Sequence, residues 1–177
     1  MSSQIPSGST INSATLSLYY FFHGANDPSG RTYWAYRLTT TDWVEGTLNG
    51  AVETGSSDWG HRQHDTLSWT TPGGDYTTTN GASTTVPSSY GWMSWTVTFQ
   101  VQTAVDSVGR VAHFLIKDGT EGSSTSYEAQ FYSKENSNTN KPKLYVDWTP
   151  PNAAPTNDQL SLDLTGASYK GSKTLLC

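Results

Sequence analysis

A period-two alternation over Ala14–Phe22, "ATLSLYYFF", constrains the fold of this chain more than any other feature. It puts Leu16, Leu18, Tyr20 and Phe22 on one face and Ser17, Tyr19 and Phe21 on the other. Such alternation predicts a half-buried inner strand. Thr32–Leu38, "TYWAYRL", alternates again, with Trp34, Tyr36 and Leu38 opposite Tyr33, Ala35 and Arg37. The turn-rich segment "HGANDPSGR" between the two stretches predicts that they pair as a hairpin.

Further along the chain, strand patterns outnumber helical ones. Periodicity fades from Thr39 to Tyr90, where short irregular strands are expected. Apolar residues then recur at helical spacing, predicting one short helix over Thr98–Val108, capped by Thr98 and ended by Gly109. Three later strands are expected at Arg110–Asp118, Ser126–Glu135 and Lys143–Trp148. The pattern predicts an all-β fold, an antiparallel, jelly-roll-like β-sandwich with one short helix.

The length of 177 residues, with 34% apolar content, fits one main core. We expect that core to lie within residues 1–149. The segment 150–157, "PPNAAPTN", carries three prolines in eight residues and predicts a linker. Residues 158–177 include the strand-like "QLSLDLTG", and we expect them to begin a second, incomplete domain.

Charge and composition exclude several classes of function. The formal net charge of −5 argues against nucleic acid, which requires clustered Lys and Arg. No apolar run is long enough to span a membrane, and the first residues lack the pattern of a signal peptide. Cys177 is the single cysteine, so neither an intramolecular disulfide nor a multi-cysteine metal site is expected. The aromatic-rich, Thr-rich, Lys-poor composition favours an extracellular or cell-surface location.

The stretch Ser68–Gly81, "SWTTPGGDYTTTNG", contains a glycine pair that suggests either a turn or a ligand loop. A phosphate loop would need a basic residue or a following helix, and the sequence offers neither. A reversing turn at Pro-Gly-Gly-Asp is the favoured interpretation. The alternative is a structural calcium ion bound by Asp65, Asp75 and nearby carbonyls. No other cofactor is expected.

Candidate catalytic patterns are weak. His61 and His64 are three residues apart in "HRQHD", but the segment has no helical pattern and no zinc-protease motif, so we interpret it as a solvated loop without zinc. The acidic residues Glu45, Glu53, Asp58 and Asp65 show no diagnostic spacing. A Gly-x-Ser-x-Gly nucleophile motif is absent from the sequence. The chain is therefore expected not to be an enzyme.

Five segments, in order, carry a family resemblance: "IPSGSTINSATLSLYY", "TTDWVEGT", "WTTPGGDY", "WMSWTVTFQVQTAV" and "FYSKENSNTNKPKLYVDW". Over residues 5–148 the chain resembles the DNRLRE-type domain, a family that includes the alginate-binding carbohydrate-binding module family 96 and disaggregatase-related domains. The resemblance implies a β-sandwich module of secreted or surface proteins, often beside glycan-active enzymes. The resemblance implies additional strands before "IPSG", and we expect the module to be N-terminally truncated here. A missing edge strand would leave a sheet edge open to self-association.

Strand parity indicates a candidate binding face. Tyr132 and Lys134 share a face of one predicted strand, while Lys143 and Tyr145 alternate with apolar residues on the next. Tyr19, Tyr33 and Arg37 would extend this face if the first hairpin turns the same way. Trp59 and Trp69 are expected as exposed ring platforms. The other tryptophans are interpreted as core: Trp34, Trp43, Trp92, Trp95 and Trp148.

Two functions follow as hypotheses. The first is a non-catalytic, extracellular carbohydrate-binding module whose cations meet the carboxylates of an acidic polysaccharide; the resemblance implies an alginate-like ligand. The second is a structural spacer or adhesion repeat of a surface protein, with no small ligand. An ordinary solvated sheet face explains the same parity, so the sequence leaves both hypotheses open.

Overall fold

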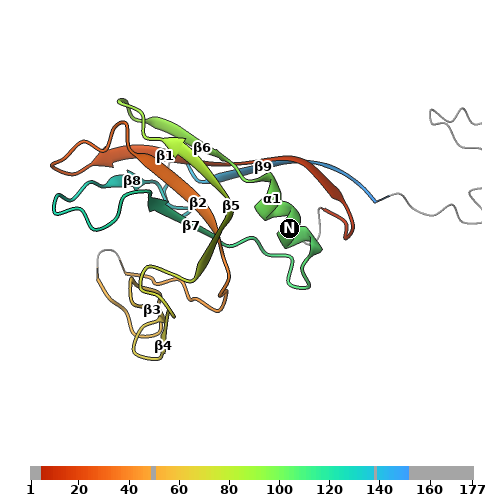
Figure 1. The fold of residues 1–177 in the computed structure, drawn as a ribbon, viewed down its shortest axis with the longest axis horizontal. Coiled ribbons are helices and arrows are strands. Elements are labelled where there is room, and N and C mark those ends of the chain that lie inside the picture. Colours follow the sequence, from red (N-terminus) through yellow and green to blue (C-terminus); the bar gives the residue numbers. More distant parts are fainter. Residues whose placement is uncertain (1–4, 49–50, 138, 152–177) are drawn as a thin grey trace, which may run out of the picture.

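The computed structural model describes residues 5–48, 51–137 and 139–151. Two antiparallel sheets pack face to face, as Figure 1 shows, and this confirms the predicted all-β sandwich. In sheet A, the long strand β1 (Thr10–His23) lies between β6 (Gly91–Thr96) on one edge and two strands on the other. Those two are β9 (Lys143–Thr149), beside the first half of β1, and β8 (Ala129–Phe131), beside its end.

Sheet B has the order β5 (Tyr76–Thr85), β2 (Thr32–Leu38), β7 (Phe114–Asp118). A small hairpin of β3 (His61–Gln63) and β4 (Leu67–Ser68) lies outside the two sheets, at the bottom of Figure 1. The predicted linker and second-domain segment, residues 150–177, lie outside the described residues except for Pro150 and Pro151.

The predicted hairpin of the first two strands is wrong. β1 belongs to sheet A and β2 to sheet B, so the segment between them crosses from one sheet to the other. Both edges of β1 are already occupied, by β6 on one side and by β9 and β8 on the other. Since a strand has only two edges, β2 pairs with β5 and β7 instead.

The core between the sheets is centred on Trp95, which is fully buried. Its indole Nε1 donates a hydrogen bond to the backbone oxygen of Tyr33, 2.9 Å away, and so joins sheet A to sheet B. Met93, Val97 and Tyr20 are buried around it. A buried indole N–H needs such a partner because leaving it unpaired costs about 1–3 kcal/mol.

The predicted facing of β2 is wrong. Tyr33 and Ala35 point into the core, whereas Trp34 and Tyr36 lie half-buried on the outer face of sheet B. Both faces of this strand carry aromatic rings, so the alternation identifies two faces without saying which one is inward. The outer ring of Tyr36 lies against Gly81, where an added Cβ would come within 2.4 Å of Tyr36.

The single helix described, α1 (Thr98–Asp106), covers one end of the sandwich beside β1 (Figure 1). It was expected, but its predicted cap is wrong: Val97 occupies the N-cap position, and Thr98 Oγ1 accepts a hydrogen bond from the backbone N–H of Ala14 at 3.0 Å. Gln102 ties the helix to β1 by accepting from Ile11 N at 2.7 Å. Across the residues described, no helix is long and apolar enough to cross a membrane.

Candidate functional site

The outer face of sheet A gathers most of the residues that parity predicted. The register places Thr15 opposite both Tyr145 and Thr96, and Ser17 opposite both Lys143 and Ser94. The residues that alternate with these on the three strands, among them Leu16, Leu144 and Trp95, belong to the core. β1, β6 and β9 therefore present one continuous polar and aromatic surface.

An aromatic row, consisting of Trp92, Tyr19, Tyr132 and Phe21, runs across this outer face. Trp92 meets Tyr19 edge to face, with ring centroids 5.3 Å apart. Tyr19 stacks on Tyr132 at 5.7 Å, and Tyr132 stacks on Phe21 at 4.2 Å with nearly parallel rings. The backbone N–H of Tyr132 donates to the Tyr19 oxygen at 3.2 Å and fixes the chain after β8 beside β1. Offset and edge-to-face contacts hold the rings in a defined arrangement.

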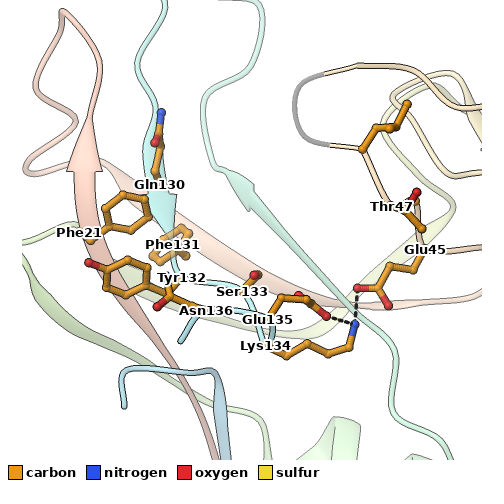
Figure 2. A pocket seen from close by; sticks show the side chains of 12 residues that line it. Phe21, Glu45, Thr47, Gln130, Phe131, Tyr132, Ser133, Lys134, Glu135 and Asn136 are labelled. Atoms are coloured by element: carbon orange, nitrogen blue, oxygen red, sulfur yellow. Dashed lines mark hydrogen bonds and ion pairs between the residues drawn. The ribbon is translucent and has the colours of Figure 1, made fainter. Parts of the chain in front are cut away.

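A cavity of about 1080 Å³ begins where the aromatic row ends. Figure 2 shows Phe21 and Tyr132 on one side of it and Glu45 and Thr47 on the other, with Lys134 between. The walls come from Phe21 of β1, from β8 and the segment after it, and from the loop after β2. The cavity is wide and lined by both rings and hydrogen-bonding groups, as sites for small or chain-like polar ligands are.

Lys134 is held between two carboxylates at this cavity. Its Nζ pairs with Glu135 and, at 2.5 Å, with Oε1 of Glu45, as the dashed lines in Figure 2 mark. Hydrogen bonds to Glu135 and Glu45 raise the pKa of Lys134. The bond from Lys134 lowers the pKa of Glu135. Lys134 therefore brings a cation to the cavity, but the local balance of one ammonium and two carboxylates is negative.

Lys143 is the second predicted cation of the face, and its surroundings differ. Its Nζ lies 4.1 Å from the centroid of the Trp92 ring, a cation–π contact. Among the residues described, the ion pairs do not involve Lys143. Tyr145, two residues further along β9, is 62% exposed. Tyr145 is thus presented to solvent, and the half-buried Lys143 lies beside the aromatic row.

Arg37 and Tyr33 do not extend this face. Arg37 is on β2 of sheet B and lines a different cavity, about 320 Å³, together with residues of α1 and the segment before β7. Tyr33 is buried in the core. The predicted extension assumed a hairpin of β1 and β2, and without that pairing the two strands lie in opposite sheets.

Trp59 and Trp69 lie apart from sheet A, beside the small hairpin, where both line a cavity of about 390 Å³. Trp59 is 63% exposed, and its ring covers Gly73, where φ is +93° and an added Cβ would come 2.8 Å from the ring. Trp69 is half-buried and donates its indole N–H to the backbone oxygen of Asp58 at 3.0 Å. The two predicted ring platforms therefore lie where the small hairpin of β3 and β4 meets sheet B, and not on the face of sheet A.

The Pro-Gly-Gly-Asp segment forms a turn: Gly73 and Gly74 both have positive φ, and Gly74 N donates to Thr71 O. Asp75 accepts hydrogen bonds from the backbone N–H groups of Thr70 and Thr71 at 3.1 and 3.0 Å. Partial burial raises the pKa of Asp75, but these bonds and one from Thr40 outweigh it and the pKa is lowered.

The other predicted calcium ligand, Asp65, has a φ of +61°. Its carboxylate lies 3.3 Å from His64 Nε2 and accepts a hydrogen bond from Thr54 Oγ1. Each of the two aspartates, Asp65 and Asp75, therefore serves its own loop, and the calcium hypothesis stays a prediction.

Sequence reasoning missed Trp92 and made little of Phe21. Trp92 was assigned to the core, yet it is 38% exposed on the outer face. The signal was present in "GWMSWT", where alternation groups Trp92 with Ser94 and Thr96 and opposes it to Met93 and Trp95. Alternation within the strand predicts the facing of Trp92 better than the general tendency of tryptophan to be buried does.

Comparison with known families gives one match. The model of carbohydrate-binding module family 96 matches residues 50–147, more than half of the 177-residue chain. The matched segment includes β3 to β8 and the first five residues of β9, and with them Trp92, Tyr132, Lys134, Lys143 and Tyr145. No curated protein and no solved structure matches the chain.

Proposed function

The chain belongs to carbohydrate-binding module family 96, and on that premise we propose that the outer face of sheet A binds an acidic extracellular polysaccharide without cleaving it. The observation that carries the proposal is the aromatic row of Trp92, Tyr19, Tyr132 and Phe21, which leads into the cavity of about 1080 Å³. A linear polysaccharide presents consecutive sugars along its chain, and a row of rings that ends in an open cavity suits several of them.

Sugar rings are recognised through two kinds of contact. Their C–H faces pack on aromatic rings, and their hydroxyl groups exchange hydrogen bonds with polar side chains. Trp92 and Tyr145 supply exposed aromatic surface, and the hydroxyl groups of Ser94 and Thr96 lie on the same side of β6. Rigid aromatic residues give large contact area at a small cost in side-chain entropy.

The preference for an acidic polymer rests on Lys143. This ammonium lies beside the exposed surface of the row and, among the described residues, makes its contact with a ring rather than with a carboxylate. A uronate carboxylate that reached it would gain a charge-assisted hydrogen bond. Lys134 would contribute only in competition with Glu45 and Glu135, so Lys143 is the principal cation of the proposed site. An alginate-like polymer is the ligand class proposed.

Binding without catalysis is proposed because of the state of the carboxylates at the cavity. Glycoside hydrolysis needs a carboxylic acid with a raised pKa as proton donor. Here Glu135 has a lowered pKa because Lys134 donates to it, and Glu45 shares the same lysine. Glu135 is therefore a poor proton donor for glycoside hydrolysis. The extracellular setting is proposed from the aromatic-rich, Lys-poor composition.

The test is affinity electrophoresis of the full chain in native gels that contain alginate, pectin, a chitin-type polymer or a neutral glucan. We expect the two anionic polymers to retard the protein most. A Lys134→Ala/Lys143→Ala variant should be retarded less by alginate, and the difference should grow at low salt because screening weakens exposed charges. If no polymer retards the unmutated chain, the spacer or adhesion-repeat function replaces this proposal.

A further inference from the structure

Asp58, His61 and His64, which we call the Asp58 cluster, bring three metal-ligand side chains together in the lobe of β3 and β4. One possible ligand atom from each lies within 4.8 Å of the others. His61 Nδ1 is 3.0 Å from Oδ1 of Asp58, and His64 Nδ1 contacts Oδ2 of the same carboxylate. The three side chains are 22–34% exposed, so the cluster is half-buried but reachable from solvent.

The local backbone fixes the carboxylate of Asp58. Its Oδ1 accepts hydrogen bonds from the backbone N–H groups of Gly60 and His61, each at 2.7 Å. The backbone oxygen of Asp58 is held in turn by Trp69 Nε1. The orientation of this carboxylate therefore does not depend on the histidines, and the cluster is preorganised around it.

Each ring nitrogen of His64 faces an oxygen of a different carboxylate. Its Nδ1 faces Oδ2 of Asp58, and its Nε2 faces Oδ1 of Asp65 at 3.3 Å. A neutral imidazole has one N–H, so it can donate to only one of these carboxylates and must turn a lone pair toward the other. With the proton on Nε2, the lone pair of Nδ1 faces the oxygen of Asp58, and a metal ion bound at this point would be coordinated by both atoms.

We propose that the Asp58 cluster binds a divalent transition-metal ion of the zinc class, through Asp58, His61 Nδ1 and His64 Nδ1. Imidazole nitrogens with one carboxylate oxygen form a donor set that suits zinc, whereas calcium takes oxygen ligands. Zinc–nitrogen distances of about 2.0–2.1 Å need only small side-chain movements from the present geometry. Water would complete the coordination.

In this proposal Asp65 does not bind the metal. It accepts a hydrogen bond from His64, which does. A metal-binding histidine commonly donates its other ring N–H to a carboxylate, which sets its tautomer and orientation. The contact of His64 Nε2 with Asp65 matches that arrangement. The sequence pattern predicted a solvated loop for these histidines. Three-residue spacing outside a helix does not reveal that the carboxylate of Asp58 lies against both of them.

The metal would stabilise the lobe of β3 and β4 and would not contact sheet A. It would tie together the segment that carries Trp59 and Trp69, which flank Asp58 in space and line the cavity of about 390 Å³. The proposed polysaccharide face lies in a different part of the fold, so this inference is independent of the proposed function, and the two can fail separately.

The experiment is isothermal titration of zinc and, separately, calcium into the untagged full chain carrying Cys177→Ser, which removes a competing thiol. We expect one equivalent of zinc to bind, with a rise in melting temperature that depends on zinc concentration. Cobalt should bind at the same site and give the visible absorption of a tetrahedral ion. Affinity should fall as the pH is lowered, because protons compete with the metal for the imidazole nitrogens.

Three variants separate a built site from adventitious binding. His61→Asn/His64→Asn should abolish the saturable zinc binding, whereas His23→Asn, at a histidine outside the cluster, should leave it unchanged. Asp65→Asn should weaken zinc affinity by about 10-fold, as loss of an outer hydrogen-bond partner does. The proposal is overturned if zinc does not bind saturably, if binding survives in the double variant, or if calcium binds as tightly as zinc. Unchanged circular dichroism of the double variant would show that it is folded.

Discussion

Each of the two sheets carries a row of aromatic rings on its outer face, and the two rows differ in what surrounds them. On sheet A, Trp92, Tyr19, Tyr132 and Phe21 lead into a cavity of about 1080 Å³. On sheet B, Trp34 stacks on Tyr36 at 5.5 Å, and Tyr36 stacks on Tyr76 at 4.8 Å. Tyr76 borders a smaller cavity, about 490 Å³.

One lysine lies beside each aromatic row, and the two lysines differ in the partners of their ammonium groups. Lys117 lies 4.8 Å from the Tyr76 ring, but its Nζ also contacts the Tyr76 hydroxyl and pairs with Glu121, each at 2.9 Å, and its side chain is only 16% exposed. Among the residues described, the ammonium of Lys143 on sheet A contacts the Trp92 ring and no carboxylate. On the proposed function, an aromatic row beside a lysine is therefore not expected to be enough for polysaccharide binding. The cation and the ring surface must also remain available.

The largest expected effect on binding is the difference between two variants, each of which replaces one tryptophan in one of the rows. Trp92→Ala should weaken polysaccharide binding about 10-fold or more, equivalent to about 1.4 kcal/mol, because it removes exposed ring surface and the support of Lys143. Trp34→Ala on sheet B should leave binding within about twofold. Dissociation constants for the preferred polymer, measured by affinity electrophoresis, check both variants.

A matched loss of binding in the two tryptophan variants would remove the distinction between the sheets. Equal losses would also arise if one variant unfolded, so urea unfolding of both is the necessary control. A larger loss in Trp34→Ala than in Trp92→Ala, with both variants folded, would transfer the proposed site to sheet B.

A smaller effect is expected from the two lysines. Lys143→Gln should reduce binding of an anionic polymer by up to about fivefold at low salt, the range of an exposed charge pair, and less at high salt. Lys117→Gln should have no effect, because Glu121 and the Tyr76 hydroxyl already occupy that ammonium. Binding measured at two salt concentrations provides the readout. A salt-independent loss in Lys143→Gln would mean that the side chain acts by packing on Trp92 and not by charge.

A gain is expected when the negative charges at the cavity are removed. Glu45→Gln/Glu135→Gln releases Lys134 from its two carboxylates and makes the cavity less negative. Affinity for an anionic polymer should rise about twofold to threefold, while binding of a neutral glucan stays unchanged. Reduced affinity for the anionic polymer would show that these glutamates bind sugar hydroxyls themselves.

Sequence patterns predicted the fold class and much of the sheet A face for a physical reason. In β9, residues that face the core alternate one by one with residues that face outward, so Lys143 and Tyr145 lie on the opposite face from Leu144 and Val146. β2 carries rings on both sides, and there the same rule could not choose the inner face. Pairing of β1 with β2 was predicted from their closeness in sequence, although strand partners depend on which edges remain unoccupied.

The Asp58 cluster was out of reach of the sequence for a related reason. Its geometry arises from a turn in which Asp58 accepts hydrogen bonds from residues two and three positions ahead. This turn brings both histidines to one carboxylate without helical periodicity. The motif Asp–x–Gly–His at residues 58–61 and the second histidine, His64, are visible in the sequence. Whether their side chains meet depends on backbone angles that a periodic pattern does not predict.

The smallest effect on binding, and a distinct effect on stability, is expected at Asp75, which immediately precedes β5 of sheet B. Asp75→Asn removes the charge that accepts from Thr70 N and Thr71 N, so we expect a loss of about 1–2 kcal/mol of unfolding free energy near neutral pH. Polysaccharide affinity should not change, because the turn lies at the end of sheet B. Urea unfolding and affinity electrophoresis of the same preparation test both statements.

The pH dependence of this loss has a definite sign. The pKa of Asp75 is lowered in the folded chain, so the unfolded chain binds its proton first, near its ordinary value of about 3.9. The stabilisation by Asp75 is therefore fully present above that pH and is lost as the pH falls toward the lower folded pKa. The difference between the original chain and Asp75→Asn should shrink correspondingly below about pH 4. A difference that persists undiminished at lower pH would mean that the shape of the side chain, and not its charge, supports the turn on the sheet B side.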